Sequence, residues 1–329
     1  MFCPRLHHFT RLMNDGTIGK CGHMVYGKGF QSFEEMEKSD WVSKIKNKME
    51  SGIWPKECRR CRVDEESKGT SVRTNSIDRH RLLAPLKQDY IIVGGVLDNT
   101  CNSACQSCNS SLSTKIGSLE SKKYIRTNNY TKFKDIPQDR ILEIDVSGGE
   151  PTASKNYKKL LRELPRNVKI VRMNTNASRM IPELEHILRK GITVIVTLSF
   201  DGIEKVHDYT RWPIGWTAYE KTLDAYIDLR ARYKLLHLDM WSTISCFNVE
   251  ILPDLIKYAG EKKIPHDWSF LDSPRVMNVR FKNKFTTRAK QVAPHAVAVD
   301  RDNDNDLRRF IEVQDKLRGI QIKDYFDFL

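Results

Sequence analysis

From residue 89 onward, short runs of apolar and β-branched residues alternate with longer stretches of helical periodicity. Each apolar run has the length of a single strand, and each helical stretch is long enough to connect two parallel strands. Strands and helices that alternate in this way form a parallel sheet, which is either open or closed into a barrel. The predicted strands are residues 89–98, 141–149, 167–176, 191–202, 235–245 and 266–274, and the predicted helices are 155–164, 181–190, 218–233 and 251–263. The alternation therefore predicts an α/β fold.

Polar and glycine-rich segments follow the predicted strands at their C-terminal ends. They are NTCNSACQSC at 99–108, Gly148-Gly149-Glu150, Asn174-Thr175-Asn176 and Ser199-Phe200-Asp201-Gly202. In parallel sheets and barrels these ends lie on one side, and the residues that bind ligands collect there. We therefore expect these segments, which are far apart in the sequence, to lie close together in one site.

Three of the eight cysteines fall within eight positions, as Cys101, Cys105 and Cys108. Structural zinc sites normally use four protein ligands, and iron–sulfur clusters that only carry electrons use four cysteines. Three thiolates on one loop therefore leave a coordination position open. The residues alone agree with a 4Fe-4S cluster whose fourth iron binds an exchangeable ligand, and also with a zinc site completed by a distant His or Cys.

The spacing C-x3-C-x2-C after the first strand, followed by GGEP after the second, resembles the radical S-adenosylmethionine (SAM) enzymes. The resemblance implies a partial (β/α)6 TIM-like barrel as the core, over residues 81–329 with a C-terminal extension. It also implies that SAM binds the open iron of a 4Fe-4S cluster on Cys101, Cys105 and Cys108. Reductive cleavage of SAM would yield a 5'-deoxyadenosyl radical that abstracts hydrogen from a substrate. The electron would come from a donor such as flavodoxin or ferredoxin.

Further segments match the same family. Gly148, Gly149 and Glu150 match the motif that binds the methionyl amino group, where glycine lets the backbone approach the ligand and a carboxylate suits an ammonium. The segment LSFDGIEKVHDYTRW resembles the subfamily of sulfatase-maturating and peptide-modifying radical enzymes. By that resemblance the SAM pocket includes Ser199 and Asp201 beside the ribose and carboxylate, Arg211 as a charge partner, and Asn174 and Asn176 from the third strand end. Each of these residue types is also common as a cap or turn at a strand end.

The first 80 residues differ in character and are expected to form a separate small unit, joined to the core by residues 78–89. This unit has a glycine-rich region with the pattern of a hairpin, followed by a predicted helix at 39–51. Its cysteines are Cys3, Cys21, Cys58 and Cys61. The set resembles the twitch domain, the short form of the SPASM domain, and the resemblance implies a second, auxiliary 4Fe-4S cluster. By count, the four thiols would also hold zinc.

The cysteine content and the lack of targeting signals predict a cytoplasmic protein without membrane association. Eight cysteines in 329 residues are too few for a disulfide scaffold, and their grouping is typical of metal ligation in a reducing compartment. The segment MFCPRLHHFTR lacks the apolar core of a signal peptide, and the longest apolar run is too short to cross a bilayer. Cys246 lies in a predicted strand and is expected to be a small buried hydrophobe.

The net charge of +13 and the pI of about 9.3 permit an anionic partner without choosing one. From the family resemblance we expect an enzyme that acts on a peptide or protein side chain. A radical SAM enzyme that acts on nucleic acid or an anionic metabolite is the alternative within the class. The alternative from another class is a basic nucleic-acid-binding protein stabilised by zinc. That alternative does not explain why cysteines, glycines and the Ser-Phe-Asp-Gly segment follow successive strands.

Overall fold

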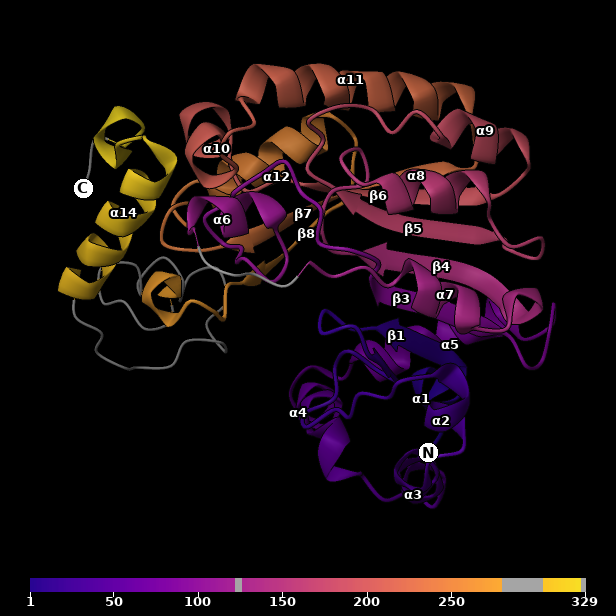
Figure 1. The fold of residues 1–329 in the computed structure, drawn as a ribbon. Coiled ribbons are helices and arrows are strands. Elements are labelled where there is room, and N and C mark those ends of the chain that lie inside the picture. Colours follow the sequence, from indigo (N-terminus) through magenta and orange to yellow (C-terminus); the bar gives the residue numbers. More distant parts are fainter. Residues whose placement is uncertain (122–125, 280–303, 327–329) are drawn as a thin grey trace.

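A sheet of eight strands forms the centre of the chain (Figure 1). The computed structural model describes residues 1–121, 126–279 and 304–326. The strands are β1 (Phe9–Leu12), β2 (Ile18–Gly19), β3 (Ile91–Val96), β4 (Ile141–Ser147), β5 (Ile170–Thr175), β6 (Thr193–Ser199), β7 (Leu236–Ile244) and β8 (His266–Phe270). They lie in the order β2-β1-β3-β4-β5-β6-β7-β8, and β3 to β8 are parallel. Each predicted strand contains one of β3 to β8, so the predicted parallel sheet is confirmed.

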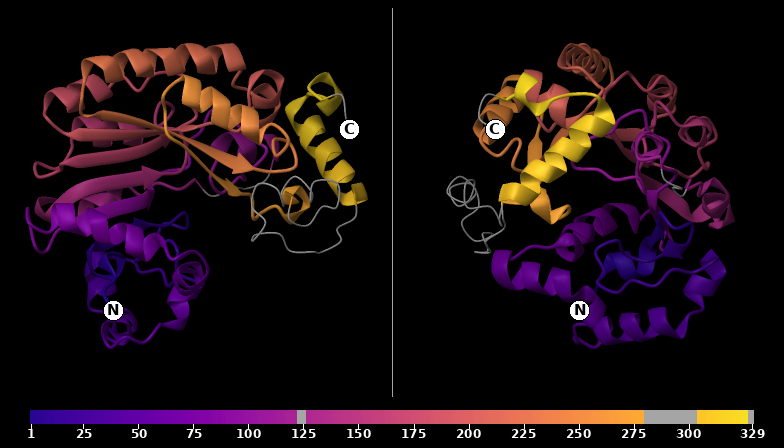
Figure 2. Two further views of the ribbon diagram at one scale, coloured as in Figure 1. Left: turned by 180° about the vertical axis from the view of Figure 1, so that it is seen from behind. Right: turned by 60° about the vertical axis from the view of Figure 1, so that its left-hand side comes forward.

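Helices connect the parallel strands and cover one face of the sheet (Figure 2). The predicted helices are confirmed as α8 (Lys155–Arg162), α9 (Leu184–Arg189), α11 (Trp216–Arg232) and α12 (Leu252–Glu261). The shorter elements are α6 (Thr114–Leu119), α7 (Tyr130–Asp135), η2 (Gln138–Arg140), α10 (Glu204–Thr210), η3 (Arg275–Met277) and η6 (Ile322–Asp324). A longer helix, α14 (Asp304–Arg318), had no counterpart among the predicted elements.

One face of the sheet is apolar and the other is mostly hydrophilic, because successive side chains along each strand point to opposite faces. On the face under the helices, alternate residues of β6 from Val194 to Leu198 are fully buried in the main apolar core. The opposite face, here called the polar face, carries hydrophilic side chains in matching register. It includes Glu143, Asp145, Ser147, Arg172, Asn174, Thr197, Ser199, Asp239 and Asp267, together with the aromatic Trp241. The polar face is thus the surface of the sheet that the connecting helices leave uncovered.

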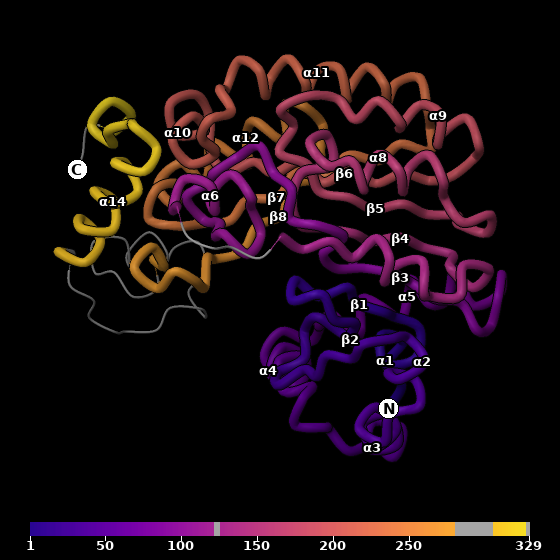
Figure 3. The backbone as a smooth tube through the Cα atoms, viewed as in Figure 1, coloured from indigo at the N-terminus to yellow at the C-terminus, as the bar shows by residue number. Residues whose placement is uncertain are grey.

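The N-terminal unit contributes strands to the same sheet. β1 pairs in parallel with β3, and β2 pairs antiparallel with β1, which confirms the predicted hairpin (Figure 3). Its helices are α1 (Pro4–His8), α2 (Phe33–Glu37), α3 (Asp40–Glu50), η1 (Lys56–Cys58), α4 (Arg59–Lys68) and α5 (Val72–Leu83). The predicted helix at 39–51 is α3. The first half of the expected connection at 78–89 is helical, because α5 continues to Leu83, which is buried against the sheet. The domain boundary near residue 80 stays a prediction.

α14 lies beside α10 (Figure 1). It buries Leu307, Ile311, Asp315 and Arg318, which recur with helical spacing on one side. The hydroxyl of Tyr209 in α10 donates to Asp315 at 2.9 Å. In the described part of the chain, no helix has both the length and the apolar character needed to cross a bilayer.

Two candidate metal centres

Residues 97–113 between β3 and α6, here called the cysteine loop, carry Cys101, Cys105 and Cys108. Cys105 is buried and the other two are half-buried. Ser103 lies among them: its N–H donates to Cys101 Sγ at 3.4 Å, and its hydroxyl lies 3.1 Å from Cys105 Sγ. All three thiols are free. The loop therefore presents three unmodified sulfur atoms just beyond the C-terminal end of β3.

The three thiols interact electrostatically. Burial, followed by the neighbouring Cys105 thiol, raises the pKa of Cys101 to about 12. The same two causes raise the pKa of Cys108 to about 12. In the described residues, the side-chain positions do not bring together any group of three His, Cys, Asp or Glu that could hold a metal ion. The chemistry of this donor set nevertheless fits a cationic centre, because buried thiolates need a positive charge nearby.

Residues at the end of α10 hold the cysteine loop in place. Ala104 N–H donates to the carbonyl of Trp212 at 2.8 Å. Gln106 N–H donates to the carbonyl of Thr210 at 2.9 Å. The hydroxyl of Ser103 lies 3.1 Å from the carbonyl of Arg211. The conformation of the loop is therefore determined by a segment more than a hundred residues further along the chain.

The glycine turn after β4 packs directly on the cysteine loop. Gly148 and Gly149 have φ values of +79° and +62°. A Cβ atom on Gly149 would lie 2.5 Å from the carbonyl oxygen of Thr100, and one on Gly148 would lie 2.7 Å from Val96. The backbone N–H of Glu150 donates to that same Thr100 oxygen at 2.8 Å. Both the backbone conformation and the close approach therefore require glycine here.

The side chain of Glu150 is buried and fully hydrogen-bonded. Its Oε1 accepts the backbone N–H of Thr152 at 3.0 Å, the Thr152 hydroxyl at 2.9 Å and the Thr175 hydroxyl at 2.9 Å. Its Oε2 accepts the backbone N–H of Asn176 at 2.8 Å. Burial raises the pKa of Glu150, and these hydrogen bonds act in the opposite direction. The carboxylate thus joins the ends of β4 and β5, and its predicted contact with an ammonium group stays a prediction.

The two asparagines at the end of β5 take different positions. Asn176 is 5% exposed, and its Nδ2 donates to Asn102 Oδ1 in the cysteine loop at 2.8 Å. Asn174 is exposed on the polar face, where it lies beside Thr197 of β6. Asn176 therefore belongs to the cluster of segments around the cysteines, whereas Asn174 faces the open sheet.

Asp201 and Arg211 form a buried ion pair behind the cysteine loop. Arg211 Nη1 donates to Asp201 Oδ2 at 2.6 Å, and Thr243 N–H donates to Asp201 Oδ1 at 2.7 Å. Burial would lower the pKa of Arg211, but Cys105 and Asp201 outweigh it and raise that pKa. Arg211 Nε is buried and has no partner among the described residues. Ser199 lies half-buried at the end of β6.

The structure thus brings the cysteine loop, the glycine turn, Asn176 and the Asp201–Arg211 pair to one end of the sheet, as the strand-end argument predicts. It also adds Arg318, which sequence reasoning missed. Arg318 lies in α14, and its Nε donates to the carbonyl of Ala104 at 2.9 Å. In the sequence, only the helical spacing of apolar residues such as Leu307 and Ile311 could have predicted this helix. No feature of the neighbouring residues indicates that Arg318 contacts the cysteine loop.

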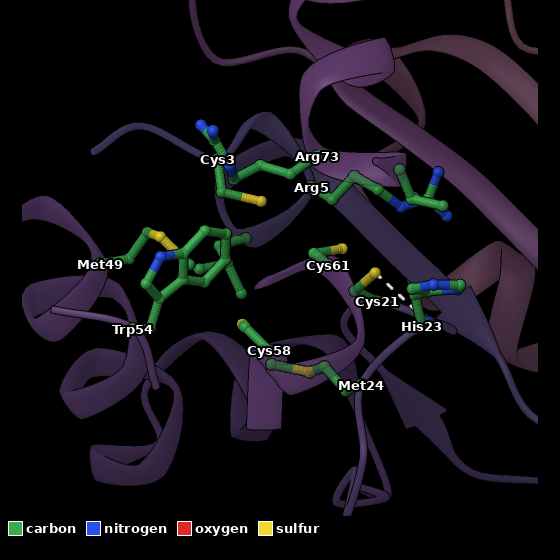
Figure 4. A pocket seen from close by; sticks show the side chains of 12 residues that line it. Cys3, Arg5, Cys21, His23, Met24, Met49, Trp54, Cys58, Cys61 and Arg73 are labelled. Carbon is green, nitrogen blue, oxygen red and sulfur yellow. Dashed lines mark hydrogen bonds between the residues drawn. The ribbon is translucent and has the colours of Figure 1, made fainter. Parts of the chain in front are cut away.

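Cys3, Cys21, Cys58 and Cys61 line a second pocket, in the N-terminal unit. Figure 4 shows their side chains around this space, together with Trp54 and Met24. Cys3 and Cys58 occupy the N-cap positions of α1 and α4, and Cys61 lies in the first turn of α4. The four cysteines therefore come from three separate segments that the N-terminal fold brings together.

The thiols of this second pocket are free and influence one another. Burial is the largest cause that raises the pKa of Cys3 to about 11 and that of Cys58 to about 12, and the neighbouring thiols act in the same direction. His23 N–H donates to Cys21 Sγ at 3.4 Å. Four sulfur donors around one pocket fit a group with its own positive charge, either an iron–sulfur cluster or zinc.

The fold and the two sites define an α/β protein with one thiol cluster beyond the C-terminal end of β3 and a second thiol cluster in the N-terminal unit. No protein-family model matches the chain, and no curated protein matches it. Among solved structures the chain is similar to SuiB of Streptococcus suis bound to S-adenosylmethionine, with 15% identity over 94% of this chain and 69% of that chain and a TM-score of 0.43.

Two further SuiB structures are similar to a comparable degree. The structure bound to the precursor peptide SuiA has 14% identity over 95% of this chain and 69% of that chain, with a TM-score of 0.42. A third SuiB structure has 14% identity over 94% of this chain and 68% of that chain, with a TM-score of 0.39. These values describe a distant likeness and assign no role to any residue of this chain.

Proposed function

We propose that the chain is a radical SAM enzyme with a second iron–sulfur cluster. The observation that carries this proposal is the packing of the glycine turn on the cysteine loop, at the ends of two neighbouring strands. Glu150 N–H donates to Thr100 O at 2.8 Å, and Gly149 N–H donates to Leu112 O at 3.3 Å. A cluster with three cysteine ligands has one open iron, and the close packing of the glycine turn brings the end of β4 beside the loop on which the exchangeable ligand of that iron would bind.

Cys101, Cys105 and Cys108 would hold the first 4Fe-4S cluster. When bound, this cluster and SAM supply a one-electron cleavage that yields a 5'-deoxyadenosyl radical. The chain's own residues bind and orient these groups. The buried Nε of Arg211 is a donor without a partner in the described residues, which fits an anionic group of a ligand. The burial of Asp201 and Asn176 excludes water from the same region.

The polar face supports a peptide or protein as the substrate. It begins below the strand ends and offers both charges and an aromatic ring: Arg172 is half-buried, and Trp241 is 41% exposed. Trp241 lies beside Asp267 of β8 in register. An indole flanked by carboxylates suits cationic and apolar side chains of a peptide better than the phosphates of a nucleic acid.

The second pocket supports an auxiliary 4Fe-4S cluster that assists electron transfer. Four thiols would complete its ligation, so it would not bind a substrate through iron. A four-cysteine zinc site is the alternative for this pocket. None of the eight cysteines forms a disulfide, which agrees with a reducing compartment such as the cytoplasm and with an electron donor of the flavodoxin or ferredoxin type.

Metal analysis of the chain purified without oxygen tests the proposal. We expect about eight irons per chain, and about four after Cys101, Cys105 and Cys108 are all replaced by Ala. Cys246→Ala is the matched control, because Cys246 is buried in the apolar core and belongs to neither set. Incubation with SAM and a reductant should release 5'-deoxyadenosine from wild type and not from the triple variant. Zinc in place of iron in both sites would overturn the proposal in favour of a zinc-stabilised nucleic-acid-binding protein.

If the chain is a radical SAM enzyme, a competition experiment with nucleic acid distinguishes a peptide substrate from a nucleic-acid substrate. Turnover of a peptide should be unaffected by added nucleic acid at physiological salt, because non-specific binding to a basic protein weakens steeply with salt. Product formation on RNA or DNA, or strong inhibition of peptide turnover by either, would favour a nucleic-acid substrate instead.

A further inference from the structure

Arg318 is a buried guanidinium without a carboxylate partner. It lies at the end of α14 and is 7% exposed. Its Nε donates to the carbonyl of Ala104 at 2.9 Å, and its Nη2 lies 3.5 Å from the carbonyl of Cys105. Its Nη1 donates to the carbonyl and the side chain of Gln314. Throughout the described ranges, no Asp or Glu lies within ion-pair distance of Arg318. Asp315 acts on Arg318 only from a longer distance, because its carboxylate is hydrogen-bonded to Tyr209 and Ile322.

The other buried guanidinium beside the cysteine loop is neutralised. Arg211 is paired with Asp201 at 2.6 Å, so these two residues together carry almost no net charge. Arg318 lies within electrostatic range of both Cys105 and Cys108. Arg318 is therefore a positive charge beside the loop that has no directly paired carboxylate among the described residues, and Asp315 balances it only from a longer distance.

The anchoring of α14 prevents Arg318 from turning into solvent. Asp315, one turn earlier, accepts the hydroxyl of Tyr209 at 2.9 Å and the N–H of Ile322 at 2.6 Å. Leu307 and Ile311 of the same helix side pack in the main apolar core. The guanidinium is thus held against the cysteine loop by a helix that is fixed along most of its length.

A buried guanidinium that is not directly paired is unfavourable, so a further negative charge beside it would stabilise it. Three thiolates that bind a 4Fe-4S cluster would supply negative charge next to Arg318, in addition to the more distant charge of Asp315. We propose that Arg318 is a positioning residue that holds the cysteine loop and stabilises the reduced form of the cluster on that loop. This inference rests on the proposed function.

The charge of Arg318 determines in which direction it shifts the reduction potential of the cluster. Uptake of one electron from a low-potential reductant makes the thiolate-bound cluster more negative. A nearby cation in a site of low dielectric stabilises the reduced form more than the oxidised form, which raises the reduction potential. Removal of the guanidinium should therefore lower the potential and make the cluster harder to reduce.

Redox titration of the cluster, followed by electron paramagnetic resonance with dithionite as the reductant, tests the proposal in the full chain. Cys58 and Cys61 are replaced by Ser in every sample, so that only the first cluster contributes a signal. Arg318→Met removes the charge and keeps the length of the side chain. We expect the reduced state to become at least tenfold less stable relative to the oxidised state, a shift of about 59 mV. Arg318→Lys keeps the charge and should restore most of the potential.

Lys316→Met is the matched control, because it removes the same charge from the exposed side of the same helix. Its potential should equal that of the parent, since solvent screens an exposed charge. An unchanged potential in Arg318→Met, or loss of iron in both Arg318→Met and Arg318→Lys, would overturn the electrostatic role. Loss of iron in Arg318→Met alone would support it. Absence of an iron–sulfur signal in the parent would instead contradict the proposed function itself.

Discussion

Glu150 and Asn176 are joined by a hydrogen bond of 2.8 Å, from the backbone N–H of Asn176 to the carboxylate of Glu150. This bond connects the ends of β4 and β5 inside the candidate site. Asn176 in turn donates to Asn102 in the cysteine loop. One buried carboxylate therefore links the glycine turn, the third strand end and the cysteine loop into a single rigid region.

Glu150→Gln should weaken this link. The amide of Gln would present an NH2 group to one of the donors that the carboxylate accepts, and a buried unpaired donor costs about 1–3 kcal/mol. We expect the free energy of unfolding in urea to fall by that amount and SAM affinity to fall about tenfold to a hundredfold, while iron content stays level. Glu163→Gln, at an exposed helix end, is the control. Unchanged SAM affinity would remove Glu150 from the site.

Gly149→Ala should separate the glycine turn from the cysteine loop. The new Cβ would lie 2.5 Å from the Thr100 carbonyl, in addition to the strain of a positive φ. Gly191→Ala is the matched control, because Gly191 also has a positive φ of +75° but open space around its Cβ position. We expect a loss of about 1–2 kcal/mol for Gly191→Ala and a larger loss for Gly149→Ala. Only Gly149→Ala should also lower iron content and SAM binding. Equal effects of the two substitutions would show that the approach to Thr100 is unimportant.

Replacing Cys58 and Cys61 by Ser should remove the metal of the second pocket. Thiolate ligation stabilises small units, so limited proteolysis should then cut residues 1–80 faster than in wild type. We expect turnover of substrate to be lost, while SAM cleavage without substrate largely survives, because the first cluster keeps its ligands. Full turnover by the double variant would mean that the second centre has no part in the reaction.

His207 should make the chain sensitive to acid. It is fully buried against Tyr219, with ring centroids 4.6 Å apart. Burial, followed by the charge of Arg211, lowers the pKa of His207 to about 3 from its ordinary 6.5. Because the folded pKa lies below the unfolded pKa, the stability from neutral His207 is present above pH 6.5. It is lost as the pH falls from 6.5 towards 3, by about 1.4 kcal/mol per unit.

Urea unfolding at pH 7.5, 6.5 and 5.5 measures this dependence. His207→Phe should lose between pH 6.5 and 5.5 about 1 kcal/mol less than wild type does, because half of the unfolded chains already carry the proton at pH 6.5. His186→Phe is the control, because His186 is exposed on α9 and should leave the dependence unchanged. The same slope in wild type and His207→Phe would contradict a neutral buried His207.

Local patterns in the sequence determined the secondary structure of the core. The β-rich run of residues at 235–245 predicted a strand, and the structure has Leu236–Ile244. Helical periodicity placed α11 and α12 in the same way. Periodicity is a property of neighbouring residues, so it is readable without the fold. The same local sequence patterns also predicted that the cysteines come directly after β3.

Contacts between distant segments were decided only by the tertiary structure. Nothing in the local sequence indicates that Glu150 accepts four hydrogen bonds, because the donors Thr175 and Asn176 lie at the end of β5 and reach it only when the strands pair. The residue type suggested an ammonium partner, and its surroundings supply backbone and hydroxyl donors instead.

The same holds for the N-terminal strand and for α14. β1 joins the edge of β3 because two separated segments match in register, which no local pattern encodes. Arg318 meets Ala104 across 214 positions of the chain. A charged residue in a helix is ordinarily exposed, and only the packing of α14 on the cysteine loop buries this one. Residue chemistry and periodicity are local properties of the chain, whereas the environment of each side chain depends on which remote segments pack around it.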